Sequence, residues 1–373
     1  MLNRIFQYSF QLTVLLLVFC IVSQGQEKNG INIDSILNKN FDKNDPYNGV
    51  ILIAEKGKTI FQQAYGYRDI ETGVKLKVDD VFELASVSKQ FTAMIIMMLQ
   101  QEGKLKYDDP VEKYLSIPYK GITIRNLLNH TSGLPDYQEI MDKHWDKSKA
   151  AGNNDILEYI NKYAPPVLFV PGAKYEYSNT GYVLLASIAE KASGEDFSMM
   201  LRKRIFSKLN MKHTDIRTVS EKKKLSNLAY GHMLVKGALE YKKADSFPSS
   251  NYTIWLGNRE GPGRISSTAQ DLLKWDRALY DRSFLTPAMI SEAFKPALLN
   301  DGKLSQYGFG WDLLIDQRYG KVVEHNGDNP GYKTQIVRYI DADKTIILLC
   351  NNAHANFPTL LVALKGYISS KVN

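Results

Sequence analysis

Short apolar runs rich in β-branched residues stand near both ends of the chain and predict strands. Near the start, residues 49–54 and 59–66 follow this pattern, and Glu55-Lys56-Gly57-Lys58 between them is typical of a hairpin turn. Near the other end, further strands are predicted over residues 307–315, 322–324, 335–340 and 345–350, with a turn at 341–344. Strands from the two ends are therefore expected to pair in one sheet.

Apolar positions at helical spacing dominate the middle of the chain and its last segment. Helices are predicted over residues 86–101, over 181–192 between a Thr180 cap and Gly194, from the capping-box sequence at 267–270 to residue 280, and over about 358–371. The expected fold class is α+β: an antiparallel sheet of N- and C-terminal strands flanked by helices, with a mostly helical inserted lobe.

These predicted elements fit one domain over residues 26–373. Its α/β lobe would comprise about 31–80 and 305–373, and its helical lobe about 81–304. Functional groups are then expected where the lobes meet.

The first 25 residues read as a secretory signal peptide. Arg4 precedes an apolar run at 12–22, and Ser23-Gln24-Gly25 supplies small residues for cleavage after Gly25. The run is shorter than the roughly 20 residues that span a bilayer, so stable membrane insertion after cleavage is not expected. An uncleaved anchor and lipidation at Cys20 are weaker alternatives. We expect an exported protein, periplasmic or secreted.

Composition excludes several classes of function. Hydrophobic residues make up 44% and charged residues 23% of the chain, as in ordinary globular proteins. The net charge of +7 is interleaved with acids and accompanied by no nucleic-acid motif. The six histidines lack metal-site spacing, so neither a metal nor a cofactor is expected. Cys350 would be the only cysteine after processing and is interpreted as a core residue. The oligomeric state stays open.

Candidate chemistry begins with Ser86-Val87-Ser88-Lys89. A serine three residues before a lysine at the start of a helix places a hydroxyl and an amine one turn apart on one face. Lysine can activate a serine nucleophile if burial and a second positive neighbour lower its pKa by roughly three from about 10.4. Taken alone, the pair is better interpreted as a helix cap and a surface lysine than as a catalytic pair. The same spacing recurs from Ser220 to Lys223, in a charged run typical of solvent-exposed surface.

Two further motifs strengthen the catalytic interpretation. Tyr177-Ser178-Asn179 lies on a predicted loop, where a tyrosine can pass a proton and an asparagine can orient Lys89 or bind a substrate amide. His325-Asn326-Gly327 ends a predicted edge strand, where the glycine would let substrate backbone approach and the next amide, Asp328 N–H, would face an oxyanion. No G-x-S-x-G sequence is present, which argues against an α/β-hydrolase.

In this order the three motifs resemble the serine β-lactamase and penicillin-recognising superfamily, specifically its class C β-lactamase, DD-peptidase and carboxylesterase branch. The resemblance spans about residues 45–365 and includes further similar segments, at 129–135, 209–211, 267–275, 307–311 and 329–332. It implies that Ser86 is acylated, that Lys89 and Tyr177 are acid/base partners, and that Asn179 positions polar groups. His325 and Gly327 would lie on the substrate-facing strand, and the Ser86 and Asp328 amides would form the oxyanion hole.

Two departures from the family pattern sharpen the expectation. His325 stands where many β-lactamases carry lysine, which predicts weak β-lactamase activity and a pH dependence near the His325 titration. Arg264 stands where this branch often has glycine, and would touch either substrate or the surface. We expect an acyl-enzyme hydrolase of amides, esters or lactams, with D-alanyl peptides as a candidate substrate. The alternatives are a true β-lactamase and a non-catalytic module that binds peptidoglycan fragments.

Overall fold

A six-stranded antiparallel sheet organises the protein and joins the two ends of the chain. The computed structural model describes residues 32–370, apart from 239 and 282. In spatial order the strands are β10 (Asp312–Asp316), β11 (Gly320–Asn329), β12 (Tyr332–Tyr339), β13 (Lys344–Cys350), β1 (Gly49–Glu55) and β2 (Lys58–Tyr65). The β1–β13 pairing runs from Gly49 opposite Cys350 to Glu55 opposite Lys344. The α+β fold expected from the sequence is confirmed.

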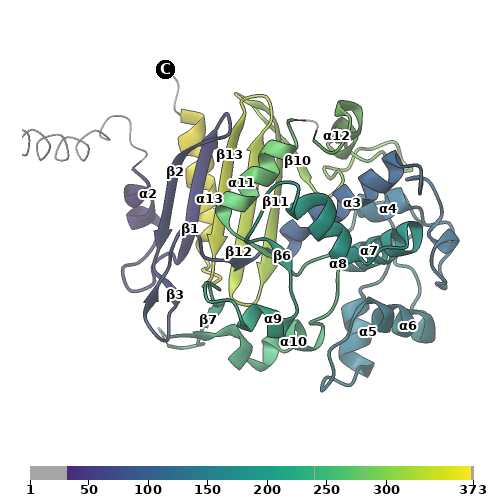
Figure 1. The fold of residues 1–373 in the computed structure, drawn as a ribbon, viewed down its shortest axis with the longest axis horizontal. Coiled ribbons are helices and arrows are strands. Elements are labelled where there is room, and N and C mark those ends of the chain that lie inside the picture. The colour runs from purple at the N-terminus through teal and green to yellow at the C-terminus, as the bar shows by residue number, and fades with distance from the viewer. Residues whose placement is uncertain (1–31, 239, 282, 371–373) are drawn as a thin grey trace, which may run out of the picture.

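Both faces of the central strands are buried, which explains their continuous apolar sequences. On β13, Ile346 and Leu348 face one core cluster, whereas Ile347 and Leu349 face another. The first cluster is closed by the terminal helices α2 (Ile33–Asn40) and α13 (Phe357–Ser370), and Cys350 lies in it, buried as expected. Figure 1 shows the sheet on one side of the molecule and most other helices on the opposite side.

The helical part fills most of the chain between β2 and β10. Its helices of eight or more residues are α3 (Lys89–Gln101), α5 (Tyr137–His144), α6 (Asn153–Tyr163), α7 (Asn179–Ser193) and α11 (Ala269–Ala278). Shorter turns of α-helix are α4 (Ile124–Leu128), α8 (Phe197–Leu201), α9 (Val219–Lys223), α10 (Tyr252–Trp255) and α12 (Pro287–Ala293). A π-helical turn, η4 (Arg202–Phe206), follows α8.

Small sheets connect the two parts. One consists of β5 (Phe82–Glu83), β9 (Ile265–Ser267) and β6 (Asp215–Ile216); the others pair β3 (Tyr67–Asp69) with β4 (Val74–Lys75) and β7 (His232–Leu234) with β8 (Tyr241–Lys243). Because β5 leads directly toward α3, the β5–β9 pairing fixes where that helix begins.

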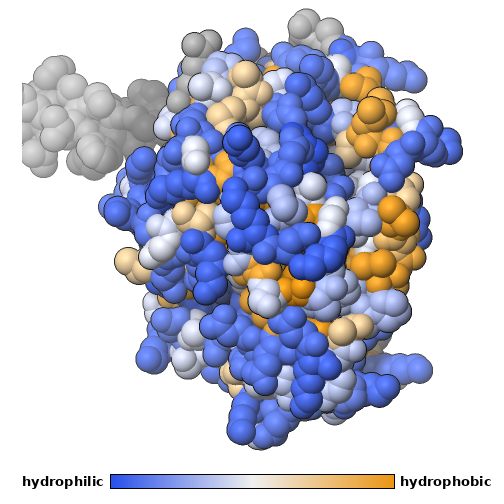
Figure 2. Space-filling view, turned by 90° about the vertical axis from the view of Figure 1, so that its right-hand side faces the viewer, coloured by the Kyte–Doolittle hydropathy of each residue, from blue (hydrophilic) through white to orange (hydrophobic). Residues whose placement is uncertain are grey.

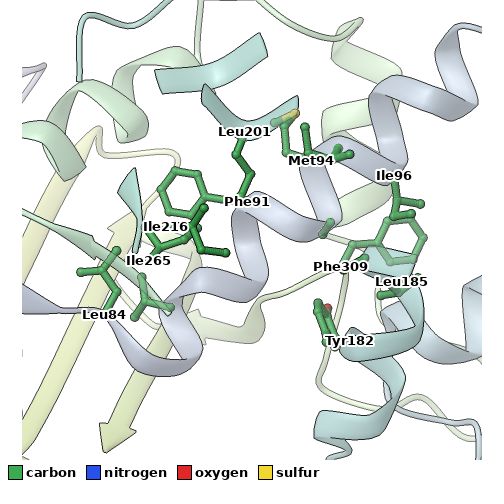
Figure 3. Packing of buried hydrophobic residues seen from close by; sticks show 14 of the residues in the cluster. Leu84, Phe91, Met94, Ile96, Tyr182, Leu185, Leu201, Ile216, Ile265 and Phe309 are labelled. Carbon is green, nitrogen blue, oxygen red and sulfur yellow. The ribbon is translucent and has the colours of Figure 1, made fainter. Parts of the chain in front are cut away.

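Helix α3 forms the centre of the helical part. All but two of its residues, from Lys89 to Leu99, are buried. In Figure 3 its Phe91 points toward Ile216 and Ile265, and its Ile96 lies near the ring of Phe309. The helix that carries Lys89 is therefore rigidly held on all sides.

The surface of the helical side is mostly hydrophilic, with a few separate apolar patches (Figure 2). Within the described residues, no helix is long and apolar enough to cross a membrane. The predicted signal peptide at 1–25, with Cys20, lies outside the described residues.

Several predicted boundaries were wrong in detail. Residues 307–311 form a tight turn rather than a strand: Gly310 has φ +78°, and a Cβ on Gly308 would lie 2.0 Å from Ala293 O. The α7 helix is capped by Ser178 and not by Thr180, whose hydroxyl instead donates to Pro135 O. Gly194 ends the helix as predicted, with φ +72°.

Strand β11 is not an edge strand over its whole length. Its first half lies between β10 and β12, but the pairing with β10 stops at Glu324. From His325 to Asn329 the strand pairs with β12 alone, so one side of this segment faces the helical part.

Candidate active site

Ser86 lies on a single 3₁₀ turn, η2 (Ala85–Ser88), between β5 and α3. The sequence predicted a helix starting at Ser86, whereas the α-helix begins at Lys89. Ala85 has φ +47°, a left-handed conformation that is strained for a residue with a Cβ. The Ser86 side chain makes no capping hydrogen bond, so the interpretation as a helix cap is excluded.

The turn is fixed by its neighbours. Leu84 O accepts a hydrogen bond from the Thr334 hydroxyl on β12, at 2.8 Å, and Leu84 N donates to Ile265 O on β9, at 2.9 Å. Ile265 N in turn donates to Ser88 Oγ, at 3.2 Å. The nucleophile candidate is thus held by both the large sheet and the small one.

Lys89 reaches back along its helix to Ser86. Its Nζ lies 3.0 Å from Ser86 Oγ, 2.9 Å from Asn179 Oδ1 and 3.1 Å from Pro262 O. A neutral amine has two N–H donors and one lone pair. It can therefore donate to Asn179 and Pro262 while accepting from the Ser86 hydroxyl, which is the arrangement of a general base.

The electrostatics favour that neutral amine. Lys89 is 0% exposed, and desolvation first, then the positive charge of Arg259, hold its pKa well below the usual value. Asp136 acts weakly in the opposite direction. A lysine needs burial together with a second cation to act as a base at neutral pH, and the sequence motifs did not indicate that this cation is Arg259.

Tyr177 and Asn179 meet Lys89 from the start of α7. Asn179 is the first residue of that helix, and the preceding loop is fixed where Ser178 N donates to His130 Nδ1, at 3.1 Å. Lys89 Nζ lies 4.6 Å from the centre of the Tyr177 ring. Tyr177 is 40% exposed, while its hydroxyl interacts with the Ser86 side chain.

Desolvation raises the pKa of the Tyr177 phenol, and the interaction with Ser86 only partly opposes that shift. The phenol is therefore protonated at neutral pH. Tyr177 is placed to give a proton to a leaving group, whereas Lys89 is placed to take one from Ser86.

His325 is buried beside Tyr307 and does not lie on an exposed, substrate-facing surface. It is 1% exposed; its Nδ1 donates to Asn326 O at 2.6 Å, and its Nε2 accepts from the Tyr307 hydroxyl at 2.8 Å. Desolvation and the charge of Lys89 lower the pKa of His325 to about 3. The expected pH dependence near an ordinary histidine titration is therefore wrong, because the ring stays neutral from pH 5 to 8.

Gly327 has a different purpose from the one predicted. A Cβ there would lie 2.1 Å from Leu84 O and 2.3 Å from Thr334 Oγ1, so the absent side chain lets β11 pack against the Ser86 turn. The next residue, Asp328, directs its carboxylate outward to Lys333 Nζ, at 2.9 Å. The role of the Asp328 and Ser86 amides as an oxyanion hole stays a prediction.

Arg264 is a buried residue and not a surface residue. It is 7% exposed, its guanidinium donates to Arg217 O, and the charge of Glu83 acts on it. Its φ of +80° explains why glycine suits this position.

Sequence reasoning missed the loop at 257–263 entirely. This loop supplies Pro262 O to Lys89 and brings Arg259 near it. Its composition, Gly257-Asn258-Arg259-Glu260-Gly261-Pro262-Gly263, was the available signal: glycines and proline that let backbone approach closely, together with charged residues. A Cβ on Gly261 would lie 2.0 Å from Tyr182 O, which shows how close that approach is.

Other sequence predictions were tested by the surroundings. Ser220 and Lys223 lie exposed on α9, as expected for a chance occurrence of the spacing. Within residues 32–370, leaving aside 239 and 282, no cluster of three or more histidine, cysteine, aspartate or glutamate side chains could hold a metal ion.

Comparison with known proteins shows which family the chain is similar to. A family model described as Beta-lactamase matches residues 39–363. Penicillin-binding protein 4* of Bacillus subtilis (strain 168) is 40% identical over 308 residues, which cover 82% of this chain and 68% of that protein. The chain thus spans about two thirds of that relative's length.

Solved structures show the same fold. A penicillin-binding protein from Bacillus halodurans superimposes with a TM-score of 0.77 at 22% identity, over 91% of this chain and 99% of that one. D-amino acid amidase from Ochrobactrum anthropi SV3, complexed with D-phenylalanine, gives a TM-score of 0.70 at 25% identity, over 90% and 100%.

Proposed function

The chain belongs to the Beta-lactamase family of serine hydrolases, and from that premise we propose that it is an exported acyl-enzyme hydrolase of D-alanyl peptides and related D-amino acid amides. The observation that carries the proposal is the Lys89 amine, 3.0 Å from Ser86 Oγ and held neutral by burial and by Arg259. Export rests on the signal sequence at 1–25 alone.

The proposed reaction has two stages. Lys89 takes the Ser86 proton as Ser86 Oγ attacks the substrate carbonyl, and the Tyr177 phenol gives a proton to the departing amine as the C–N bond breaks. The proton that Lys89 then carries restores the Tyr177 phenol, which completes the proton balance of this stage. Water then attacks the ester on Ser86 and releases the acid.

Two observations favour peptide or amide substrates over rapid lactam turnover. The position of His325 carries no charge at neutral pH, so it offers no fixed cation there for the carboxylate of a lactam. The similar solved structures include a D-amino acid amidase, and the similar curated proteins include a penicillin-binding protein.

The test is intact-protein mass spectrometry after incubation with a fluorophosphonate and, separately, with a penicillin. Wild type is expected to gain the mass of each acyl or phosphonyl group, and Ser86→Ala to gain neither. Ser220→Ala is the matched control, because it removes the serine of the second S-x-x-K spacing, which lies on the surface, and is expected to react like wild type.

The fate of the penicillin adduct separates the candidate activities. Persistence over hours, together with D-alanine release from a D-alanyl-D-alanine peptide, supports the proposal. Loss of the adduct within seconds would make the protein a β-lactamase. Absence of any adduct on wild type would overturn the proposal in favour of a non-catalytic binding module.

A further inference from the structure

A second cavity lies at the end of the large sheet, away from the candidate active site. Helix α11 packs against β1 and β13, whereas the ends of β10 and β11 lie beside the short helix α12 (Figure 1). The cavity between these elements has a volume of about 710 Å³. That volume falls within the roughly 300–1,000 Å³ that is usual for small-molecule sites. Its lining, as described, includes none of Ser86, Lys89 and Tyr177.

Apolar side chains form most of the cavity wall. They come from both sides: Leu313, Val323 and Ile340 from the sheet, and Leu285, Ile290 and Phe294 from the helical part. Ile315 of β10 also lines the cavity and is 77% exposed, so the apolar wall is open to solvent along this edge of the sheet. A ligand with an apolar chain would remove this surface from water, which favours binding.

The charged residues of the lining are mostly cations. Lys295, Lys321 and Arg338 line the cavity together with a single acid, Asp341. Lys295 is paired with Glu292, at 3.0 Å. Asp341 accepts a hydrogen bond from the backbone N–H of Lys321, at 3.0 Å, while the Lys321 side chain is exposed and forms no ion pair within the described residues. An uncompensated ammonium group therefore lies at the edge of an apolar cavity.

Arg338 points to the same side of the sheet as Lys321. Arg338 lies opposite Val323 in the β11–β12 register, and Lys321 is two residues before Val323, so alternation places both cations on one face. Diagonal neighbours of this kind are about 7–8 Å apart. Arg338 bonds Asp276 through Nε and Nη2, which leaves Nη1 buried without an acceptor. This face thus offers an ammonium group and a guanidinium N–H to an anion.

An apolar chain that ends in an anion matches both properties of the cavity. The chain would lie between the sheet and α12, and the head group would accept hydrogen bonds from Lys321 Nζ and Arg338 Nη1. We propose that the cavity binds a single-chain anionic amphiphile, at a site separate from the catalytic one. The inference goes beyond the proposed hydrolase function and does not depend on it.

The head group can come from two sources, a free fatty acid or a phosphate-bearing lipid with one chain. Isothermal titration calorimetry of the full chain at pH 8 compares decanoate, decyl phosphate and decanol, which share one chain length. One decanoate molecule per protein is expected to bind, with decanol at least about 5-fold weaker because it lacks the charge. Tighter binding of decyl phosphate than of decanoate identifies the phosphate lipid as the source, and the reverse order identifies the fatty acid.

The chain and the head group are tested separately. Hexanoate should bind at least about 10-fold more weakly than decanoate, because four methylene groups fewer are buried. Lys321→Gln should weaken decanoate binding about 3- to 10-fold and change decanol binding by less than about 2-fold. Lys303→Gln is the matched control, because this lysine is exposed and pairs with Asp301 elsewhere on the surface.

The apolar wall is tested by Ile290→Glu, which should weaken all three ten-carbon ligands. Val362→Glu is its control, because Val362 is 68% exposed on α13 and lies outside the cavity lining. If Ile290→Glu does not fold, Ile315→Glu replaces it, since the Ile315 side chain is mostly exposed. Protein labelled beforehand with fluorophosphonate should bind decanoate as unlabelled protein does.

Several results would overturn the proposal. These are no saturable binding of decanoate, equal affinities for decanoate and decanol, and binding that both Lys321→Gln and the wall variant leave unchanged. A homodimer that Ile315→Glu dissociates, without decanoate binding, would assign the cavity to a second copy of the chain and overturn the proposal as well. Failure of fluorophosphonate to label wild type would defeat the proposed hydrolase function alone, because amphiphile binding is measured without catalysis.

Discussion

Two long basic side chains are buried where the sheet meets the helical part, and their surroundings are opposite. Arg338 on β12 is 1% exposed and donates through Nε to Asp276 Oδ1 at 2.5 Å and through Nη2 to Asp276 O at 3.2 Å. Arg277 also bonds the Asp276 carboxylate, at 2.6 Å. Lys89 is as deeply buried, but its hydrogen-bond partners are an amide oxygen, a carbonyl and a hydroxyl.

The difference shows how one chain treats a buried charge in two ways. The charge of Arg338 is compensated by the Asp276 carboxylate, and the aromatic rings of Tyr280 and Trp311 lie beside the guanidinium. Lys89 has no carboxylate partner and a second cation nearby, so it loses its charge and becomes a base. The surroundings of Arg338 stabilise the charged side chain. The surroundings of Lys89 destabilise the charged amine and so leave it available as a base.

Removing the uncompensated amine should produce the largest effect. Lys89→Met is expected to lower the rate of Ser86 acylation about 10²- to 10⁴-fold, the usual contribution of a general base. Stability should change in the opposite direction. The pKa of Lys89 is lower in the folded than in the unfolded protein, so stability is lost as the pH falls below the unfolded value, and at pH 7 the variant should be more stable than wild type.

Stopped-flow kinetics measure the acylation rate, and urea denaturation of the same preparation measures the stability. A variant that loses activity and stability together would mean that Lys89 is a structural residue. Lys303→Met serves as the control, because this lysine is exposed and its ion pair with Asp301 lies on the surface.

Removing the compensating carboxylate should reverse the pattern. Asp276→Asn leaves Arg338 charged and buried without its anion, which typically destabilises a protein by about 3–5 kcal/mol. Activity per folded molecule should stay near that of wild type, because Asp276 does not contact Ser86 or Lys89. The measurements are the midpoint of urea denaturation and the fraction of protein labelled by fluorophosphonate. A variant as stable as wild type would contradict the role of Asp276 in compensating the charge of Arg338.

The smallest effect is expected from a third buried group. The pKa of His325 is about 3, so its ring is neutral across pH 5–8 and cannot create an activity limb there. Rate–pH profiles of wild type and His325→Gln should therefore have the same shape over that range, and any limb should follow Lys89. A limb near pH 6.5 that disappears in the variant would restore the histidine titration.

Much of this site could be predicted because its motifs are local. Ser86 and Lys89 are one turn apart, and Tyr177 and Asn179 flank a helix start that the sequence marks with Gly194 at its other end. The fold class followed from strands with two buried faces at both ends of the chain. In these cases spacing and periodicity contain the physical information.

The unpredicted parts depend on contacts between distant segments. His325 was expected to face substrate because its strand does, but alternation along β11 turns the ring inward to Tyr307. Arg259 and Pro262 carry no motif, and only the closeness of their loop to α3 and α7 gives them importance. Position 327 requires glycine for a reason that no sequence shows, the approach of Leu84 O.

The pairing of β1 with β13 has a consequence for the order of events during synthesis. The Tyr47 hydroxyl bonds Leu349 O across 302 positions of sequence, so the first hairpin must wait until β13 has been made before this neighbour arrives. The turn that carries Ser86 rests on β11 and β12, which emerge long after the turn itself. A growing chain thus possesses its nucleophile and its lysine early but lacks the support that aligns them, and hydrolysis is reserved for the finished molecule.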